Sequence, residues 1–197
     1  MIVGVDEAGR GPLAGIVTGC ALYLKKSPPF LVRDSKELSC SGREKIFQWL
    51  AQNAFFYVGI ATPEEIDRLN ILQATFLAFN RAISGLLEKI PHLKKATFIV
   101  DGNIFRTDLK VHYVCMEKAD KKVKEVSCAS IVAKVTRDHL MGVADFLFPQ
   151  WGFYRHKGYP TKEHFSSIEK YSLSPLHRRT FFPCNKIASA DTLTMVQ

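Results

Sequence analysis

The chain has 197 residues, 47% of them apolar, which is enough to bury the core of one domain. Lys and Arg total 27 against 19 for Asp and Glu, and the net charge of +8 favours an acidic partner such as nucleic acid, although a merely soluble basic protein carries the same signal. Five cysteines without CxxC spacing argue against a zinc or disulfide framework, and no apolar run approaches the roughly 20 residues of a membrane span, so we expect a cytoplasmic protein with reduced thiols and no signal peptide.

The first half of the chain alternates strand and helix signals. Residues 2–5 are a short apolar run that predicts a buried strand, and residues 16–24 predict its hairpin partner. The capping-box spacing of residues 41–44 predicts a helix start, and residues 55–61 predict a third strand. A second capping box at residues 62–65 is followed by apolar side chains at spacings of three and four, which predict one face of a long helix ending at Pro91.

The second half begins with a strand and is mostly helical. Residues 96–100 predict a fourth strand, residues 110–115 a fifth, and residues 125–147 a helix. Thr161 is placed to cap a short helix, and the composition after Pro183 is small and polar, which indicates a tail. We therefore expect an α/β domain over residues 1–183, whose mixed five-stranded sheet starts with antiparallel neighbours, later receives a strand through a helical crossover and is flanked by helices, with a helical C-terminal region and a tail at 184–197.

Carboxylates stand where two of the apolar strands end. Val5 precedes Asp6 and Glu7, and Val100 precedes Asp101. Ligand sites in α/β sheets are common at strand ends, and if these two strands are neighbours, repulsion between the carboxylates raises a pKa unless a cation binds them. Sparse carboxylate ligands suit Mg²⁺, and two ions about 4 Å apart can support phosphodiester cleavage.

Two considerations limit this metal-site hypothesis. Successive strand residues point to opposite faces, so Asp6 and Glu7 cannot both reach one ion through their side chains unless the strand bends; Glu7 then serves a second ion or offers its carbonyl oxygen. Asp101 with Gly102 also fits an ordinary turn, and Asp6-Glu7 also fits a solvated strand end.

A longer pattern runs through the chain in order. It comprises Gly4-Val5-Asp6-Glu7-Ala8-Gly9-Arg10-Gly11-Pro12-Leu13-Ala14-Gly15, Asp34-Ser35-Lys36, Val100-Asp101-Gly102-Asn103, Ala129-Ser130-Ile131-Val132-Ala133-Lys134-Val135-Thr136-Arg137-Asp138, His156-Lys157-Gly158-Tyr159-Pro160-Thr161-Lys162-Glu163-His164 and His177-Arg178-Arg179-Thr180-Phe181. This ordered set resembles the motifs of the ribonuclease HII family over residues 1 to about 182. The related HIII type carries an extra N-terminal domain, and because the motif begins at residue 4 we expect the HII type.

The resemblance implies an RNase H-like fold and endonucleolytic cleavage of RNA in RNA/DNA hybrids. It also implies incision on the 5′ side of single ribonucleotides in duplex DNA, leaving 3′-hydroxyl and 5′-phosphate ends. The implied cofactor is Mg²⁺ or Mn²⁺, as two ions with substrate bound, held by Asp6, Glu7, Asp101 and Asp120. Family members usually show Gly-Asp at the fourth carboxylate, whereas here Ala119 precedes Asp120, which alters the backbone if the glycine's φ is positive.

The resemblance also implies how substrate is recognised. Gly9, Arg10 and Gly11 contact the nucleotides at the RNA–DNA junction, and Tyr159 lies against the sugar on its DNA side, where an aromatic face tolerates no extra hydroxyl. Taken alone, these residues also fit a glycine-rich turn and a packed tyrosine. Candidate phosphate contacts are Lys36, Lys134, Arg178 and Arg179.

Several alternatives remain at this point. His177 is read as structural or phosphate-facing, because a two-metal scheme needs no protein base. We expect a monomer that binds RNA/DNA hybrids and ribonucleotide-containing duplexes. A DNA junction or strand-transfer nuclease would share the carboxylates but lack the Gly9-Arg10-Gly11 and Tyr159 pairing, and a duplex-binding module without catalysis would not need four carboxylates.

Overall fold

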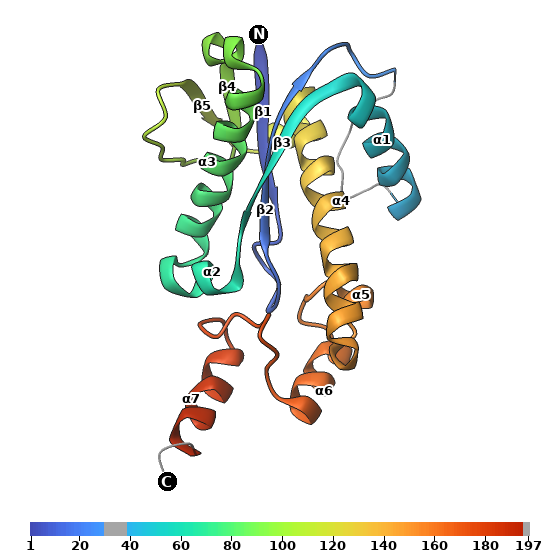
Figure 1. Cartoon of the computed structure of the whole chain (residues 1–197), viewed down its shortest axis with the longest axis vertical. Coiled ribbons are helices and arrows are strands. Elements are labelled where there is room, and N and C mark those ends of the chain that lie inside the picture. The colour runs from blue at the N-terminus through green and yellow to red at the C-terminus, as the bar shows by residue number, and fades with distance from the viewer. Residues whose placement is uncertain (30–38, 195–197) are drawn as a thin grey trace.

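The computed structural model describes residues 1–29 and 39–194, so the predicted Asp34-Ser35-Lys36 loop lies outside the described residues. Within the described part of the chain, one mixed sheet has five strands in the order β3-β2-β1-β4-β5 (Figure 1). The strands are β1 Ile2–Ala8, β2 Val17–Leu24, β3 Ala54–Ala61, β4 Thr97–Asp101 and β5 His112–Met116.

The topology makes neighbours of two distant stretches. β1 pairs antiparallel with β2, and β2 pairs antiparallel with β3, so the first three strands form a meander. The chain then crosses over through helices and returns as β4, which lies parallel to β1 on its other side, and β5 extends the sheet parallel to β4. The predicted mixed α/β sheet is therefore confirmed, including its antiparallel start and its helical crossover.

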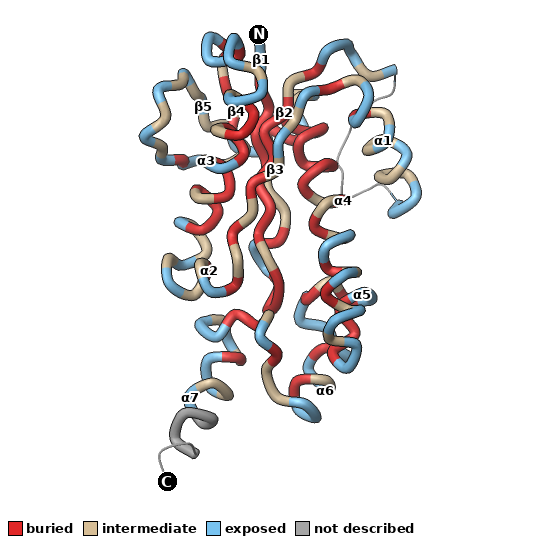
Figure 2. The backbone as a smooth tube through the Cα atoms, in the orientation of Figure 1, coloured by how far each residue is buried: buried red, intermediate tan, exposed pale blue. Residues whose placement is uncertain are grey.

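Helices cover both faces of this sheet (Figure 1). α3 (Ile71–Lys89) packs on one face against β2 and β3, and Ala21 belongs to the core on that side. α4 (Lys124–Leu147) packs on β1 and β2 from the other face, where Cys20 and Leu22 are buried. β2 is buried along almost its whole length, which shows that both faces of the strand are covered, and the buried backbone in Figure 2 is concentrated there.

Two helix starts differ from the sequence-based expectation. α1 (Cys40–Asn53) is capped by Ser39, whose side chain accepts a hydrogen bond from the Gly42 N–H, rather than beginning at Ser41. α2 (Pro63–Leu69) has the predicted capping box, but the long helix expected beyond it is interrupted at Asn70. Asn70 has a φ of 69° and its side chain caps α3, so α2 and α3 are separate helices.

The C-terminal region is helical and lies beyond one end of the sheet (Figure 1). It contains α5 (Phe153–His156) and α6 (Lys162–Tyr171), and Thr161 caps α6 as predicted by accepting a hydrogen bond from the His164 N–H. The segment after Pro183 that was expected to be a tail contains α7 (Cys184–Thr194), and Cys184 is buried in the core of this region.

Three short 3₁₀ helices complete the described structure: η1 Pro91–Lys95, η2 Ala119–Lys121 and η3 Pro149–Trp151. All five cysteines are free thiols. In the part of the chain that is described, no helix combines the length and apolarity needed to cross a bilayer.

Candidate active site

The ends of β1 and β4 bring Asp6 and Asp101 together. The last parallel pair between these strands is Val5 with Val100, and each aspartate follows its valine by one residue. Neighbouring strands lie about 4.8 Å apart, so the two carboxylates share one edge of the sheet. Asp6 is only 5% exposed and Asp101 is half-buried, which confirms that the two acidic strand ends are neighbours.

The electrostatics of these carboxylates are unfavourable. Burial raises the pKa of Asp6 well above its ordinary value, and repulsion from Glu7 and Asp101 raises it further, while hydrogen bonds from the Ser130 side chain and the Glu7 N–H oppose the shift. Burial also raises the pKa of Glu7, which Arg10 lowers and Asp101 raises. Crowded acids of this kind are stabilised by a cation, and for Glu7 the Arg10 guanidinium at 3.6 Å supplies part of that charge.

β1 does not bend at its two carboxylates. Asp6, Glu7 and Ala8 continue in regular antiparallel register with β2, opposite Cys20, Gly19 and Thr18. The side chains of Asp6 and Glu7 therefore leave opposite faces of the strand, as the sequence predicted for an unbent strand.

Asp120 lies in η2, which is hydrogen-bonded to the end of β4. The Ala119 N–H donates a hydrogen bond to Asp101 Oδ1 at 2.6 Å, and the adjacent Asp120 is 7% exposed. The left-handed residue of this turn is Lys118, with a φ of 56°, so Ala119 has no left-handed strain where the family usually has glycine. Among the described residues, no three His, Cys, Asp or Glu side chains converge as a ready metal-binding group.

The loop after β1 is held from inside by Arg178. This side chain has no exposed surface, and burial together with the neighbouring Arg137 lowers its pKa to about 9. Its guanidinium donates hydrogen bonds of 2.6–3.3 Å to the main-chain oxygens of Gly9, Arg10, Pro12, Gly15 and Ile16. The prediction that Arg178 contacts phosphate is therefore wrong, because its guanidinium is enclosed and bound to carbonyl oxygens.

Arg137 is a second buried arginine, and it joins two loops. It donates hydrogen bonds of 2.9–3.2 Å to the carbonyl oxygens of Ile16, Lys157 and Ala14. Gly9 has a φ of 99°, and a Cβ there would lie 2.2 Å from the Arg137 Nε atom, so the loop closes over this guanidinium only with glycine at that position. No local sequence signal indicates this role, because a buried arginine and a surface arginine look alike in a single sequence.

Tyr159 lies beside the same loop. Its ring is close to Gly11, where an added Cβ would lie 3.9 Å from Cε1, and the side chain remains 40% exposed. Lys134 Nζ and the Arg137 guanidinium carbon each lie 5.9 Å from the ring centroid. Residues about 150 positions apart, Gly11 and Tyr159, thus form one surface.

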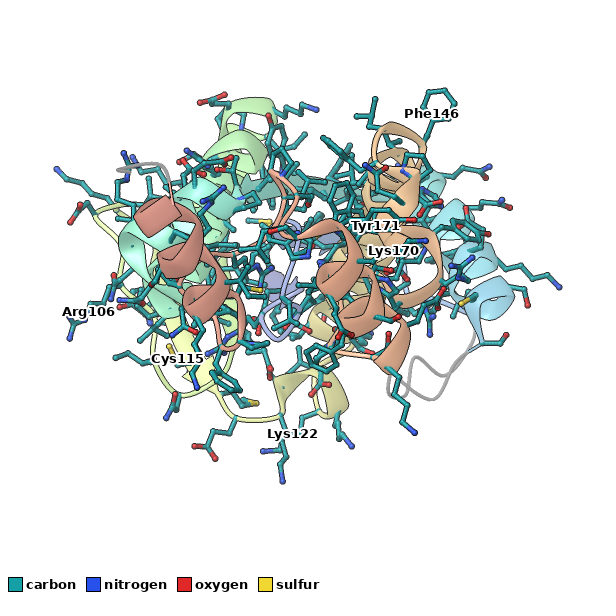
Figure 3. The ribbon with its side chains drawn as sticks, turned by 90° about the horizontal axis from the view of Figure 1, so that it is seen from below. Arg106, Cys115, Lys122, Phe146, Lys170 and Tyr171 are labelled. Carbon is teal, nitrogen blue, oxygen red and sulfur yellow. The ribbon has the colours of Figure 1, made fainter. Side chains whose placement is uncertain are left out.

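The remaining predicted contacts divide by position. Arg10 and Arg179 are exposed, and the Arg179 N–H donates to Asp67 Oδ2. Lys134 is half-buried and forms an ion pair with Asp138 at 2.7 Å. Lys36 lies outside the described residues. Lys122, beyond η2, projects outward in the end view of Figure 3 and adds exposed positive charge near Asp120.

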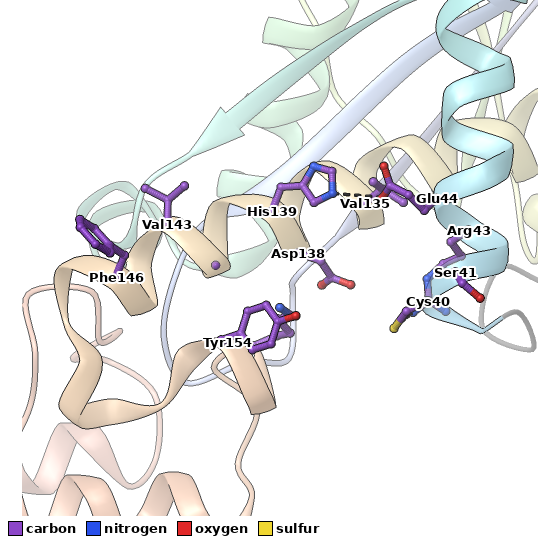
Figure 4. Close-up of a pocket in the computed structure, with 12 residues that line it drawn as sticks. Cys40, Ser41, Arg43, Glu44, Val135, Asp138, His139, Val143, Phe146 and Tyr154 are labelled. Atoms are coloured by element: carbon purple, nitrogen blue, oxygen red, sulfur yellow. Dashed lines mark hydrogen bonds and ion pairs between the residues drawn. The ribbon is translucent and has the colours of Figure 1, made fainter.

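A groove of about 770 Å³ lies beside this site rather than on it. It separates α1 from α4 and α5, and His139 Nε2 spans it to Glu44 Oε2 at 3.1 Å (Figure 4). Phe146, 85% exposed, stands at one end of the groove (Figure 4). Asp138 and Lys157 line the groove, whereas none of the four predicted acidic residues does.

The fold and the site together define a class of protein. A β3-β2-β1-β4-β5 sheet with crowded carboxylates where its two central parallel strands end is the arrangement of a ribonuclease H-type nuclease. The chain belongs to the ribonuclease HII family. The sequence model of this family, described as Ribonuclease HII, matches residues 3–184.

Individual relatives agree with this assignment. Ribonuclease HII of Thermotoga maritima is 43% identical over 193 residues, which cover 98% of this chain and 78% of the relative. The crystal structure of ribonuclease H2 from Pyrococcus horikoshii OT3 superposes with a TM-score of 0.74 at 28% identity, covering 96% of this chain and 97% of that one. A Bst-RNase HIII structure in complex with Mn²⁺ shares the fold, with a TM-score of 0.72 at 18% identity, over 96% of this chain and 69% of that one. The chain is accordingly a hydrolytic endoribonuclease.

Proposed function

We propose that this ribonuclease cleaves the RNA strand of RNA/DNA hybrids and incises on the 5′ side of ribonucleotides embedded in duplex DNA. The observation that carries the proposal is the contact between the two parts of the site. The Glu7–Arg10 ion pair at 3.6 Å joins the carboxylates to the Gly9-Arg10-Gly11 loop, and Gly11 in turn lies against Tyr159.

The carboxylates fit a divalent cation such as Mg²⁺ or Mn²⁺. Asp6, Glu7, Asp101 and Asp120 are proposed to supply the oxygen ligands of two ions when substrate is bound. Because Glu7 leaves the face of β1 opposite to Asp6, Glu7 is assigned to the second ion or offers its carbonyl oxygen. The raised pKa values of Asp6 and Glu7 support this fit, because both acids lack a full counter-charge among the protein groups around them. A bound cation of this type stabilises the charge that develops on a phosphodiester during hydrolysis.

The protein's own groups hold these acids in place. The Ser130 side chain and the Glu7 N–H bind the Asp6 carboxylate, and the Ala119 N–H binds Asp101. Arg10 partly neutralises Glu7. Each contact fixes the direction of a carboxylate before substrate arrives, and such preorganisation is what a site for charge stabilisation requires.

Substrate reading is assigned to the loop and the tyrosine. Arg137 and Arg178 draw the carbonyl oxygens of the loop inward. Gly9 is buried against Arg137 and shapes the loop, while exposed Gly11 has room to approach a ribose closely. The partly exposed ring of Tyr159 beside Gly11 is suited to pack on the next sugar, where a 2′-hydroxyl would not fit. Exposed Arg10 and Arg179, together with half-buried Lys134, are proposed to bind phosphates.

Three duplexes of one base sequence test the proposal. One carries a single ribonucleotide in DNA, one is an RNA/DNA hybrid, and one is all DNA. With Mg²⁺ or Mn²⁺ we expect cleavage of the first two and none of the third. Equal cutting of the all-DNA duplex would refute the proposal in favour of a DNA nuclease, and binding of all three without cleavage would indicate a duplex-binding module.

A further inference from the structure

Three buried histidines lie directly behind Tyr159. His156, His164 and His177 are 7%, 0% and 2% exposed, whereas the other three histidines of the chain, His92, His112 and His139, are all exposed. The rings of His156 and His164 stack with centroids 4.2 Å apart, and those of His164 and His177 lie 5.1 Å apart.

Their hydrogen bonds specify which nitrogen carries each proton. His156 Nδ1 accepts from the Gly158 N–H, so its Nε2–H donates to the Trp151 oxygen at 2.7 Å. His164 Nδ1–H donates to the Tyr159 oxygen at 3.0 Å, which leaves Nε2 as an acceptor. His177 Nδ1 accepts from the Ser174 N–H at 2.9 Å, and because this backbone donor points at Nδ1, the Ser174 hydroxyl at 2.7 Å also donates to it. The His177 Nε2–H therefore donates to His164 Nε2 at 3.0 Å.

This network tolerates only neutral rings. A second proton on His156 or His177 would meet the backbone N–H that the ring now binds, and a second proton on His164 would meet the Nε2–H of His177. The surroundings also favour the neutral rings, since burial lowers the pKa of His164 to about 4 and the pKa of His177 to about 3. The charged groups nearby are Arg179 for His177, and Glu163, Arg155 and Asp145 for His156.

The network reaches both halves of the proposed substrate-reading surface. His156 and His164 bind the main chain of Gly158 and Tyr159, and the Gly158 oxygen accepts from the Leu13 N–H at 2.8 Å. His177 precedes Arg178, whose N–H donates to the Leu13 oxygen and whose guanidinium holds the loop after β1. Gly158 has no room for a Cβ, which would lie 2.4 Å from the Ala14 oxygen, so the two loops are in tight contact.

We propose that His164, supported by His177, is a positioning residue that sets the main chain of Tyr159 against the Gly9-Arg10-Gly11 loop and so determines how strictly the ribo-to-deoxyribo junction is recognised. The proposal rests on the junction-reading role assigned to Tyr159. His164 acts through Tyr159 and touches no substrate.

Two substitutions at one position separate the hydrogen bond from the packing. His164→Phe keeps a buried ring but removes the donor to the Tyr159 oxygen, and His164→Asn restores an N–H close to the place of Nδ1. The measured quantity is junction preference, defined as kcat/KM on the single-ribonucleotide duplex divided by kcat/KM on the RNA/DNA hybrid. We expect His164→Phe to lower it about tenfold, the effect of one lost hydrogen bond, and His164→Asn to recover most of it.

Phe153→Leu is the matched control. Phe153 is fully buried with its ring centroid 5.7 Å from that of His164, but its side chain makes no hydrogen bond to the Tyr159 loop among the described contacts. It should lower the unfolding midpoint and leave the junction preference unchanged. If Phe153→Leu and His164→Phe lower the preference equally, the positioning role is overturned.

A double-mutant cycle tests whether His164 acts through Tyr159. In a Tyr159→Ala background, His164→Phe should have no further effect on junction preference, and an additive effect would overturn the proposal. If Tyr159→Ala alone leaves the preference unchanged, the reading role fails instead. Imidazole ¹⁵N spectra distinguish that case: at pH 5.5 the rings of His164 and His177 should be neutral, His164 as Nδ1–H and His177 as Nε2–H. Charged rings or other tautomers would overturn the network itself.

Discussion

Acidification should destabilise the protein through its buried histidines, and the size of the effect follows from the structure. His164 and His177 have pKa values of about 4 and about 3 when folded, against an ordinary value of 6.5. Because the folded state keeps these rings neutral, the unfolded chain binds more protons once the pH falls below about 6.5, and stability declines. Between pH 7 and pH 5, each ring contributes a loss of about 2 kcal/mol in the free energy of unfolding, or about 4 kcal/mol together.

The effect of the histidines on the pH dependence of stability has to be separated from the effect of the buried carboxylates, which has the opposite sign. The raised pKa values of Asp6 and Glu7 mean that the folded state binds protons more readily there, so those acids favour folding as the pH falls. A comparison with His164→Asn removes this background, since the variant leaves β1 untouched. The difference in stability between pH 7 and pH 5 should be about 2 kcal/mol smaller in the variant than in the wild type.

Urea unfolding at pH 5, 6 and 7 measures this difference directly, with each free energy obtained by linear extrapolation. His112→Asn, on an exposed strand residue, is the control and should keep the wild-type pH dependence. If His164→Asn shows the same pH dependence as the wild type, the ring is not held neutral and the reasoning about the network fails.

Other predictions concern catalysis and the arginines. Asp101→Asn should lower turnover by about a hundred- to a thousandfold while duplex binding persists in a gel-shift assay, and an active variant would remove Asp101 from the site. Tyr159→Ala should reduce junction preference more than duplex affinity; the opposite order would argue for a simple binding role. Arg178→Ala should cost more than about 3 kcal/mol of stability in urea unfolding because several buried carbonyl oxygens lose their donor, whereas Arg179→Ala should change it by less than about 0.5 kcal/mol. Equal effects of the two substitutions would contradict the buried role of Arg178.

The positions of the strands were predictable because their apolar runs have clear ends. Val5 and Val100 each close a buried strand before a carboxylate, and the crossover between them makes a parallel neighbour plausible from the order of elements alone. The capping side chains of Thr62 and Thr161 were predictable for a similar reason, since a cap depends on residues three positions away.

Other features depend on contacts that local sequence does not contain. The break at Asn70 has no proline or glycine to mark it, because a side-chain cap supplies the interruption. Arg178 looked like a surface cation because burial of a guanidinium needs carbonyl oxygens from a loop about 160 residues away. The neutral state of His177 depends on His164 and Ser174, which only the fold places at its two ring nitrogens.

The central claim is metal-dependent incision beside an embedded ribonucleotide, and its most direct test is the chemistry of the cut ends. A DNA duplex with one ribonucleotide, labelled on that strand, is incubated with the protein and Mg²⁺ or Mn²⁺, and the products are mapped. We predict a single cut on the 5′ side of the ribonucleotide, leaving a 3′-hydroxyl and a 5′-phosphate, which is abolished by EDTA and restored by added metal. A cut on the 3′ side that leaves a cyclic phosphate and persists in EDTA would contradict the account, because the ribose hydroxyl would then be the nucleophile and the carboxylates would not be required.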